Sequence, residues 1–402
     1  MSSQLLSTSI LGLLLAAIMV ALAARRLRLP YTVGLVLAGA GLAYAHAPGG
    51  ALLTHDLIFD IILPPLLFEA ALAIHWHDLK RDALLITILA TAGVAVAAAL
   101  VAAGMVWLLA WPLPAAVIFG VLIAATDPVA VIALFKDLNI HGRLRFLMEA
   151  ESLANDGVAA ALFGLALTWA TTVAATPPGA ASVATAFALA AGGGIAIGAA
   201  YGLLAIAVAG RTEDHLVEVA LTAVAAYGSF YLADHFHVSG VLATVAAGMV
   251  MGNFGPLRPE DTSQLSEQGR AAVTTVWEFA AFLANSLVFL LIGLAVADIR
   301  LIDLGPAQLA TIIALVQLSR AVTVYPLCAL FVRSRQAVPF AQQHILWWGG
   351  LRGALALALA LALPKDVPGH DDILIATFAV VVFSVVVQGL TMQPLLRLVG
   401  IR

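Results

Sequence analysis

Apolar stretches of about 20 residues alternate along this chain with short clusters of polar residues, glycine and proline. A transmembrane helix needs about 20 mainly apolar residues, so the pattern predicts a series of membrane-spanning helices. Strands of a membrane barrel alternate between apolar and polar residues, and the Ala-, Leu- and Val-rich stretches here lack that alternation. The predicted fold class is therefore an all-α polytopic membrane protein.

Hydropathy, with Pro, Gly and charge clusters as boundaries, predicts thirteen spans. They lie near residues 4–24, 31–46, 57–75, 83–110, 115–135, 146–173, 182–209, 215–233, 238–253, 274–297, 304–332, 341–363 and 371–397. The seventh span carries Gly194, Gly198 and Gly202 at four-residue spacing, which predicts a close contact with another helix. Gly248 and Gly252 on the ninth span permit a similar contact.

Composition excludes a water-soluble protein, because 62% of the residues are hydrophobic and 10% are charged, against about 25% charged in soluble domains. The single cysteine, Cys328, excludes an internal disulfide. No basic residue precedes the first apolar stretch, whereas Arg25, Arg26 and Arg28 follow it. These flanks predict an uncleaved first span with its amino end outside, and no signal peptide.

The basic residues test the number and orientation of the spans, because Lys and Arg of short loops collect on the cytoplasmic side. With thirteen spans, nearly all loop Lys and Arg fall in odd-numbered loops or the carboxyl tail, and Arg300 and Lys365 are the exceptions. We therefore expect the amino terminus outside and the carboxyl terminus in the cytoplasm, in the cell (inner) membrane.

The run Glu-Ser-Leu-Ala-Asn-Asp at 151–156 places two carboxylates, an amide and a hydroxyl on a stretch expected to lie within the membrane. Ionisable groups at that depth are costly and indicate function. An α-helix turns about 100° per residue, so Ser152, Asn155 and Asp156 share one face, and Glu151 lies at its edge. The pattern predicts a cluster of oxygen ligands beside a charge that can pair with another helix.

The fifth span is interrupted near its midpoint by Thr126, Asp127 and Pro128. Proline removes a backbone donor and disturbs the preceding turn, so we expect two half-helices. Asp127 is predicted to cap the second half-helix, with Pro128 at its first position and the unwound carbonyls free to bind a cation. A simple proline kink is the alternative, although a carboxylate at the break argues against it.

The twelfth span has its own interruption, Gly-Gly-Leu-Arg-Gly at 349–353. Two six-helix units joined by one linker helix would place spans five and twelve in equivalent, inverted positions. Paired interruptions of this kind are typical of secondary transporters with a binding site near the membrane midplane. There, Asp127 would offset the positive amino ends of half-helices, and Arg352 the negative carboxyl ends.

The motif Ala-Thr-Asp-Pro-Val-Ala-Val at 125–131, followed by the 151–156 run, resembles the NhaP-type antiporters of the sodium/proton exchanger superfamily. Similar matches occur at 64–70, Pro-Pro-Leu-Leu-Phe-Glu-Ala, at 285–293 and at 349–353. The resemblance covers essentially the whole chain. It implies thirteen helices in two inverted six-helix repeats with crossed discontinuous helices, the NhaA-like antiporter fold, and a homodimer.

The resemblance also implies a mobile core domain and a dimerisation domain. Helices 1–3 (1–75) and 8–10 (215–297) belong to the dimerisation domain, helices 4–6 (83–173) and 11–13 (304–397) to the core, and helix 7 (182–209) is the linker. Residue by residue, it implies that Asp156 carries the ion and the proton in turn. Asp127, Ser152 and the Thr126 backbone complete the sodium site.

In the same resemblance Asn155 supports the site, and Glu69 occupies a position that can approach the ion. Glu151 is expected to form a structural ion pair with Arg320 of the eleventh span. The resemblance implies no cofactor and no nucleic-acid partner, with Na⁺ (or Li⁺) and H⁺ as transported substrates. Glu278 and Asn285 on the tenth span are expected to join helices by hydrogen bonds, with ion contact as the alternative.

Burial disfavours a charged carboxylate, whereas a bound cation favours ionisation, so proton and cation compete at Asp156. If the core crosses between its two states only when that charge is neutralised, exchange is obligatory. The Asn-Asp pair is usual in electroneutral relatives, which predicts one cation per proton. A K⁺/H⁺ antiporter of the same fold remains the alternative, whereas repeated filter loops or an enzymatic motif, the marks of rival functions, are not apparent.

Overall fold

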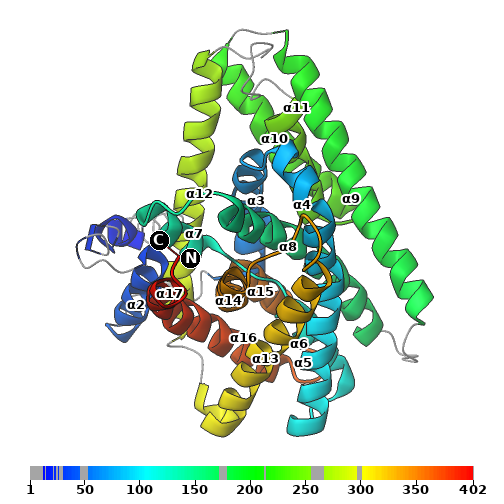
Figure 1. Ribbon diagram of the computed structural model, residues 1–402, viewed down its shortest axis with the longest axis vertical. Helices are drawn as coiled ribbons and strands as arrows, with labels where there is room; N and C mark the ends of the chain where they lie inside the picture. Colours follow the sequence, from blue (N-terminus) through cyan, green and yellow to red (C-terminus); the bar gives the residue numbers. More distant parts are fainter. Residues whose placement is uncertain are drawn as a thin grey trace.

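The chain folds into a bundle of α-helices in a computed structural model that describes residues 12, 13, 15–20, 22, 23, 26, 30–45, 53–171, 179–211, 214–254, 267–296 and 301–401 (Figure 1). No β-strand occurs among these residues, so the predicted all-α class is confirmed. The predicted first span falls mostly outside the described residues, as do Arg25, Arg28, Arg258 and Arg300 of the charge analysis.

In the described part, seven continuous helices are long and apolar enough to cross a membrane. They are Trp76–Leu109, Arg143–Thr171, Ala180–Ala209, His215–His235, Gly269–Val296, Pro306–Leu330 and His370–Leu398. Shorter apolar helices cover Tyr31–Tyr44, Leu113–Leu122 and Gly240–Phe254. The count of thirteen spans therefore stays a prediction, while every predicted span from 31–46 onward coincides with a helix or a pair of helices.

The α-helices are numbered in chain order. They are α2 (Tyr31–Tyr44), α3 (Leu63–Leu72), α4 (Trp76–Ile88), α5 (Val94–Leu109), α6 (Leu113–Leu122), α7 (Val129–Asp137), α8 (Arg143–Thr171), α9 (Ala180–Ala209), α10 (His215–His235), α11 (Gly240–Phe254), α12 (Glu267–Val296), α13 (Pro306–Leu330), α14 (Phe340–Trp348), α15 (Ala354–Leu361), α16 (His370–Phe383) and α17 (Gly389–Leu398).

Three π-helical turns lie in or beside these helices, at Leu57–Ile62, Leu89–Gly93 and Ser384–Gln388. The second joins α4 to α5 and the third joins α16 to α17 without a break in the helix. A π-turn shifts the hydrogen-bond register, which frees main-chain groups for partners outside the helix. Two carbonyls of the Leu57–Ile62 turn accept hydrogen bonds from side chains of α10.

The helices pack in two groups. One group contains α2, α3 and α9–α12, in which α12 packs along α2, and α11 packs against α9 and α3. The other contains α4–α8 and α13–α17, in which α5 packs against both α6 and α13. In Figure 1, α9 follows the right-hand edge of the molecule, while α14 and α15 lie near its middle. Both broken helices thus belong to the second group.

Small residues bring helices of the first group into backbone contact. A side chain added at Gly194, Gly198 or Gly202 would meet α11 or the residue directly before it, which confirms the close contact predicted for the glycine stripe of α9. Gly248 and Gly252 of α11 face α3 of the same chain in the same manner. These two glycines therefore serve packing within the chain, and they give no argument for a dimer.

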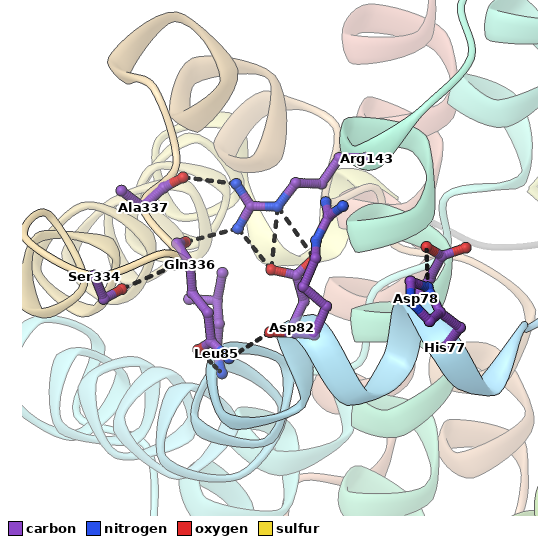
Figure 2. Close-up of polar contacts among 9 residues, drawn as sticks. His77, Asp78, Asp82, Leu85, Arg143, Ser334, Gln336 and Ala337 are labelled. Atoms are coloured by element: carbon purple, nitrogen blue, oxygen red, sulfur yellow. Dashed lines mark hydrogen bonds and ion pairs between the residues drawn. The ribbon is translucent and has the colours of Figure 1, made fainter.

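An ion-pair network ties three chain segments of the second group together (Figure 2). Asp82 of α4 is fully buried and accepts hydrogen bonds from Nε and Nη2 of Arg143, which begins α8, at 2.7–3.1 Å. The Arg143 guanidinium also donates to the carbonyls of Gln336 and Ala337, between α13 and α14, at 2.7 and 2.6 Å. Gln336 in turn bonds back to the α4 main chain.

We predict that Arg143→Ala destabilises the protein, because it leaves the buried Asp82 carboxylate with only Arg81, 3.2 Å away, as a partner. An isolated buried charge costs about 3–5 kcal/mol, and the remaining arginine should reduce the loss to roughly 2–3 kcal/mol. The midpoint of thermal unfolding in detergent measures the effect. Arg333→Ala, at an exposed position of the same loop, is the control, and equal midpoints for the two variants would contradict the prediction.

Candidate functional site

The two interrupted spans meet at their breaks. Residues 123–128 separate α6 from α7, and residues 349–353 separate α14 from α15. The main-chain N–H of Asp127 donates to the carbonyl of Leu351 at 2.7 Å, so the two unwound segments are joined by backbone atoms. The breaks leave orphan amides and carbonyls at four helix ends, which need partners because this region is buried.

Asp127 lies at the amino ends of two half-helices. Its Oδ1 accepts a hydrogen bond from the N–H of Val129 at 2.9 Å, at the start of α7. A Cβ added at Gly353 would collide with the Asp127 carboxyl group, which therefore lies against the start of α15 as well. A negative charge is stabilised at both ends by their unpaired amides. The helix begins at Val129 and not at Pro128 as predicted, because Pro128 has a ψ of 2° and precedes the first helical turn.

Arg352 lies at the carboxyl end of α6, on the other side of the first break. Its Nη1 donates to the carbonyls of Ala124 and Ala125, both at 2.8 Å, directly after α6 ends. A positive charge there offsets the negative carboxyl end of that half-helix. The carbonyls of Ala124 and Ala125 belong to the unwound stretch expected to be free for a cation, and each accepts a hydrogen bond from the guanidinium of the second break.

Asn155 and Ser152 hold Thr126 from the neighbouring helix α8. The Asn155 side chain accepts from the N–H of Thr126 at 3.2 Å and donates to its hydroxyl at 2.6 Å. The Ser152 hydroxyl donates to the Thr126 carbonyl. A carbonyl has two lone pairs, so that oxygen retains one acceptor position. The structure thus brings together three of the residues that the sequence places in the site.

Glu151 and Arg320 form a buried ion pair between α8 and α13. Both carboxylate oxygens accept from the guanidinium, each at 2.7 Å, and the two side chains are 3% and 8% exposed. Arg320 also donates to the carbonyl of Leu346 at 3.3 Å, and Gly350 lies against its Nε. The pair therefore joins α8 to the end of α14, next to the second break.

Asp156 differs from its neighbours, because its carboxylate makes no hydrogen bond to any residue that the structure describes. It lines a cavity of about 1170 Å³ together with Thr126, Asp127 and Ser152. Walls of this cavity come from both helix groups, with α2, α3 and α12 facing α7, α8 and α15. Asp156 is thus a carboxylate that faces open space beside the oxygens of the break.

Farther along the same cavity lie Glu69, Lys136, Arg145 and Glu149. The charged groups that act on Glu69 are Lys136, Glu149, Glu278 and Arg145, whereas those that act on Asp156 are Asp127, Glu151 and Arg352. The structure therefore places Glu69 in the cavity but in a different charged surrounding from that of Asp156. Arg145 and Glu149 are paired at 2.9 Å, one helical turn apart on α8.

Glu278 and Asn285 also line the cavity, and among the described residues neither side chain forms a hydrogen bond to another helix. The expectation that they join helices is wrong, because their side chains face the open cavity.

The arrangement provides oxygen ligands for a small hard cation. Four oxygen-bearing residues, Asp156, Asp127, Ser152 and Thr126, line one cavity. Alkali cations are bound by such oxygens, and the Asp156 carboxylate, which has no hydrogen-bond partner among the described residues, can offset their charge. Protonation of Asp156 would neutralise the same charge, so the cavity suits either a cation or a proton at that side chain.

Two elements of the site escape sequence reasoning. The Leu351 carbonyl that accepts from Asp127 is a main-chain group, so no pattern of side chains predicts this bond. Gly353 is required by the approach of Asp127, and a glycine in a Gly-Gly-Leu-Arg-Gly run carries no sign of which atom approaches it. The Asp82–Arg143 pair was also missed, although a carboxylate directly before the apolar stretch 83–110 was the available signal.

Residues 11–398 match the family described as sodium/hydrogen exchanger, transmembrane. The chain is 39% identical over 380 residues to the Na⁺/H⁺ antiporter ApNhaP of Aphanothece halophytica, covering 93% of this chain and 70% of that protein. It is 34% identical over 404 residues to the Na⁺/H⁺ antiporter NhaH of Halobacillus aidingensis, covering 98% and 97% of the two chains.

The fold is similar to that of the sodium proton antiporter MjNhaP1 from Methanocaldococcus jannaschii, with a TM-score of 0.78 over 100% of this chain and 99% of the other. The two sequences are 19% identical, so this likeness concerns the fold. It confirms the predicted antiporter architecture.

We predict that Arg320→Ala lowers the free energy of unfolding by about 3–5 kcal/mol, because it strands the Glu151 charge in a buried position. The double variant Glu151→Gln, Arg320→Ala should recover much of this loss. The Glu151→Gln substitution removes the charge and keeps an oxygen for the Asn155 amide, whose nitrogen lies 3.4 Å from Oε1 of Glu151. Thermal midpoints of the purified single and double variants measure the difference. A double variant no more stable than Arg320→Ala would refute the pairing energy.

Proposed function

This chain belongs to the sodium/hydrogen exchanger family, so it is a secondary transporter and not an enzyme, and we propose that Asp156 is the group at which it exchanges Na⁺ for H⁺. The observation that carries the proposal is the cavity of about 1170 Å³, which is lined by an Asp156 carboxylate without a hydrogen-bond partner among the described residues and by three further oxygen-bearing residues. Na⁺ and H⁺ are the transported substrates, and the family membership calls for no cofactor.

Competition at one carboxylate supplies the coupling. Burial disfavours the bare negative charge, and either a bound Na⁺ or a proton removes it. Asp127 is already occupied by the amide of Val129 and by the start of α15, so it acts as a fixed ligand. Thr126 and Ser152 contribute neutral oxygens. An unneutralised Asp156 is costly to carry through the closed state of the transporter, which prevents the empty site from crossing.

The surroundings of Asp156 favour electroneutral exchange of one Na⁺ per H⁺. Its neighbour Asn155 is an amide whose oxygen and nitrogen are both engaged with Thr126. Asn155 therefore adds no titratable charge to the site and holds the break in place. Glu151 is neutralised by Arg320 at 2.7 Å, so it does not exchange protons as part of the cycle.

Sodium is the proposed cation because the relatives at 34–39% identity are named Na⁺/H⁺ antiporters. Exchange of K⁺ for H⁺ is the alternative within the same fold, because selectivity among alkali cations depends on ligand geometry at the site. Glu69, in the cavity near Glu149 and Glu278, would attract cations on their way to Asp156.

We propose that α4–α8 and α13–α17 form the mobile core and that α2, α3 and α10–α12 form the dimerisation domain, with α9 as the linker. The packing of the helices in two groups supports this division. The cavity is lined by Lys136, Arg145 and Arg397, which the charge asymmetry of the loops assigns to the cytoplasmic side. The arrangement therefore represents an inward-facing state, with the carboxyl terminus in the cytoplasm of a cell whose inner membrane holds the protein.

A homodimer in contact with membrane lipid is part of the same proposal. It rests on the resemblance to the NhaP-type antiporters. Exchange across the membrane would then proceed by alternating access, in which the core moves against a fixed dimerisation domain.

We predict that Asp156→Asn abolishes Na⁺-dependent dissipation of a pH gradient in proteoliposomes, because an amide neither binds the proton nor offers a charge to the cation. Asp366→Asn, which changes an exposed carboxylate outside the cavity, should leave exchange unchanged. Fluorescence of an internal pH dye after addition of Na⁺, Li⁺ or K⁺ measures both activity and cation preference. Exchange retained by the Asp156 variant would refute its role.

Electroneutral exchange predicts that net transport stops when the Na⁺ gradient equals the pH gradient, whatever the membrane potential. Moving one net charge per cycle would instead shift that balance by about 2.3 kcal/mol per 100 mV. Proteoliposomes clamped at about 0 or −100 mV with K⁺ and valinomycin distinguish the two cases. A reversal point that moves with the imposed potential would contradict a ratio of one to one.

A further inference from the structure

The π-helical turn Leu57–Ile62, which precedes α3, is anchored on α10. The Tyr227 hydroxyl donates to the carbonyl of Ile61 and the Tyr231 hydroxyl to that of Asp60, each at 3.0 Å. The ring of Phe59 packs edge-on against that of Phe230, with centroids 5.1 Å apart. Three contacts therefore fix this turn to a helix of the first packing group.

One side chain links the same segment to the other packing group. The Nδ1 of His55 donates to the carbonyl of Ala358 in α15 at 3.1 Å. The imidazole ring stacks on Phe59, with centroids 4.8 Å apart, which orients the ring toward α15. Both the protonated ring and the neutral tautomer with its proton on Nδ1 can donate this bond, so the bond does not require a charge on His55.

The His55 bond lies outside the cavity that contains Asp156. On α15 the cavity is lined by Ala354, Leu355 and Ala356, whereas Ala358 is outside it, as is His55. Ala358 lies about one helical turn from Ala354, farther from the break at 349–353. Because the cavity is proposed to face inward, the bond joins the two groups on the opposite, closed side of the pathway.

We propose that His55 is the latch that holds the far side of the ion pathway closed. This inference rests on the proposed alternating-access exchange. When the core moves and the far side opens, α15 leaves His55, while Tyr227, Tyr231 and Phe230 keep the Leu57–Ile62 turn in place on α10. His55 is thus a positioning residue that sets the population of the inward-facing state without touching the ion.

The strength of one hydrogen bond sets the size of the expected effect. A neutral hydrogen bond of this kind changes a two-state equilibrium by roughly two- to tenfold. Loss of the bond should shift the transporter toward the state that is open on the far side. The apparent affinity for Na⁺ should then rise on that side and fall on the cavity side, so the ratio of the two changes by a comparable factor.

The decisive comparison uses three variants. His55→Phe keeps an aromatic ring for Phe59 but removes the donor, whereas His55→Asn places an amide donor close to the position of Nδ1. His77→Phe, at a side chain that is 94% exposed, is the matched control. Apparent KM for Na⁺ is measured from both faces, in right-side-out and inside-out vesicles. We expect a ratio changed by roughly two- to tenfold in His55→Phe, and a ratio close to the native one in His55→Asn and His77→Phe.

Hydrogen exchange gives a second readout that does not depend on transport. Amides in residues 54–62 and 354–362 should exchange faster in His55→Phe than in the native protein or in His55→Asn. His55→Ala replaces the Phe variant if the latter does not purify. The latch is refuted if His55→Phe and His55→Asn show the same KM ratio and the same rates of amide hydrogen exchange. Absence of exchange activity in the native protein would instead refute the proposed function and leave the hydrogen-exchange comparison as the test of the latch.

Discussion

The main-chain bond from Asp127 to Leu351 is the constraint on which the site depends, because it joins two unwound segments in the interior of a membrane protein. Unwinding a helix there frees amides and carbonyls that lipid cannot satisfy. The chain meets this demand with opposite charges, since the Asp127 carboxylate lies at the amino ends of α7 and α15 and the Arg352 guanidinium bonds the carbonyls after α6. Each break thus supplies the counter-charge that the other requires.

The polar side chains around Asp156 are engaged with one another, which supports the proposal that Asp156 is the site of exchange. Asn155 and Ser152 engage the three polar groups of Thr126, and Arg320 neutralises Glu151. These buried bonds hold the surroundings of Asp156 in place, because losing any one of them leaves an unpaired polar group. In the proposed mechanism, the occupancy of the Asp156 carboxylate is then the variable to which motion of the core responds.

Hydropathy was enough to predict the helices, because apolar length in a membrane has few alternatives. The composition of 125–131 and 349–353 likewise located both breaks, since proline and glycine act on the backbone directly. Contacts between distant segments were harder to predict from the sequence. Glu151 and Arg320 were matched through resemblance, while the Arg352 bonds to Ala124 and Ala125, the buried Asp82–Arg143 pair and the one-residue shift at Pro128 depend on how helices dock, which spacing along the chain does not encode.

The Asp127–Leu351 link limits what a comparison of related sequences can reveal about such a site. Both of its partners are peptide atoms, so no substitution at position 351 deletes the acceptor, and the two positions have no reason to change in concert. Methods that infer proximity from correlated substitutions should therefore be blind to this contact. The demand on side-chain size at this crossing comes instead from the Asp127 carboxylate, which fills the space that a β-carbon at Gly353 would need.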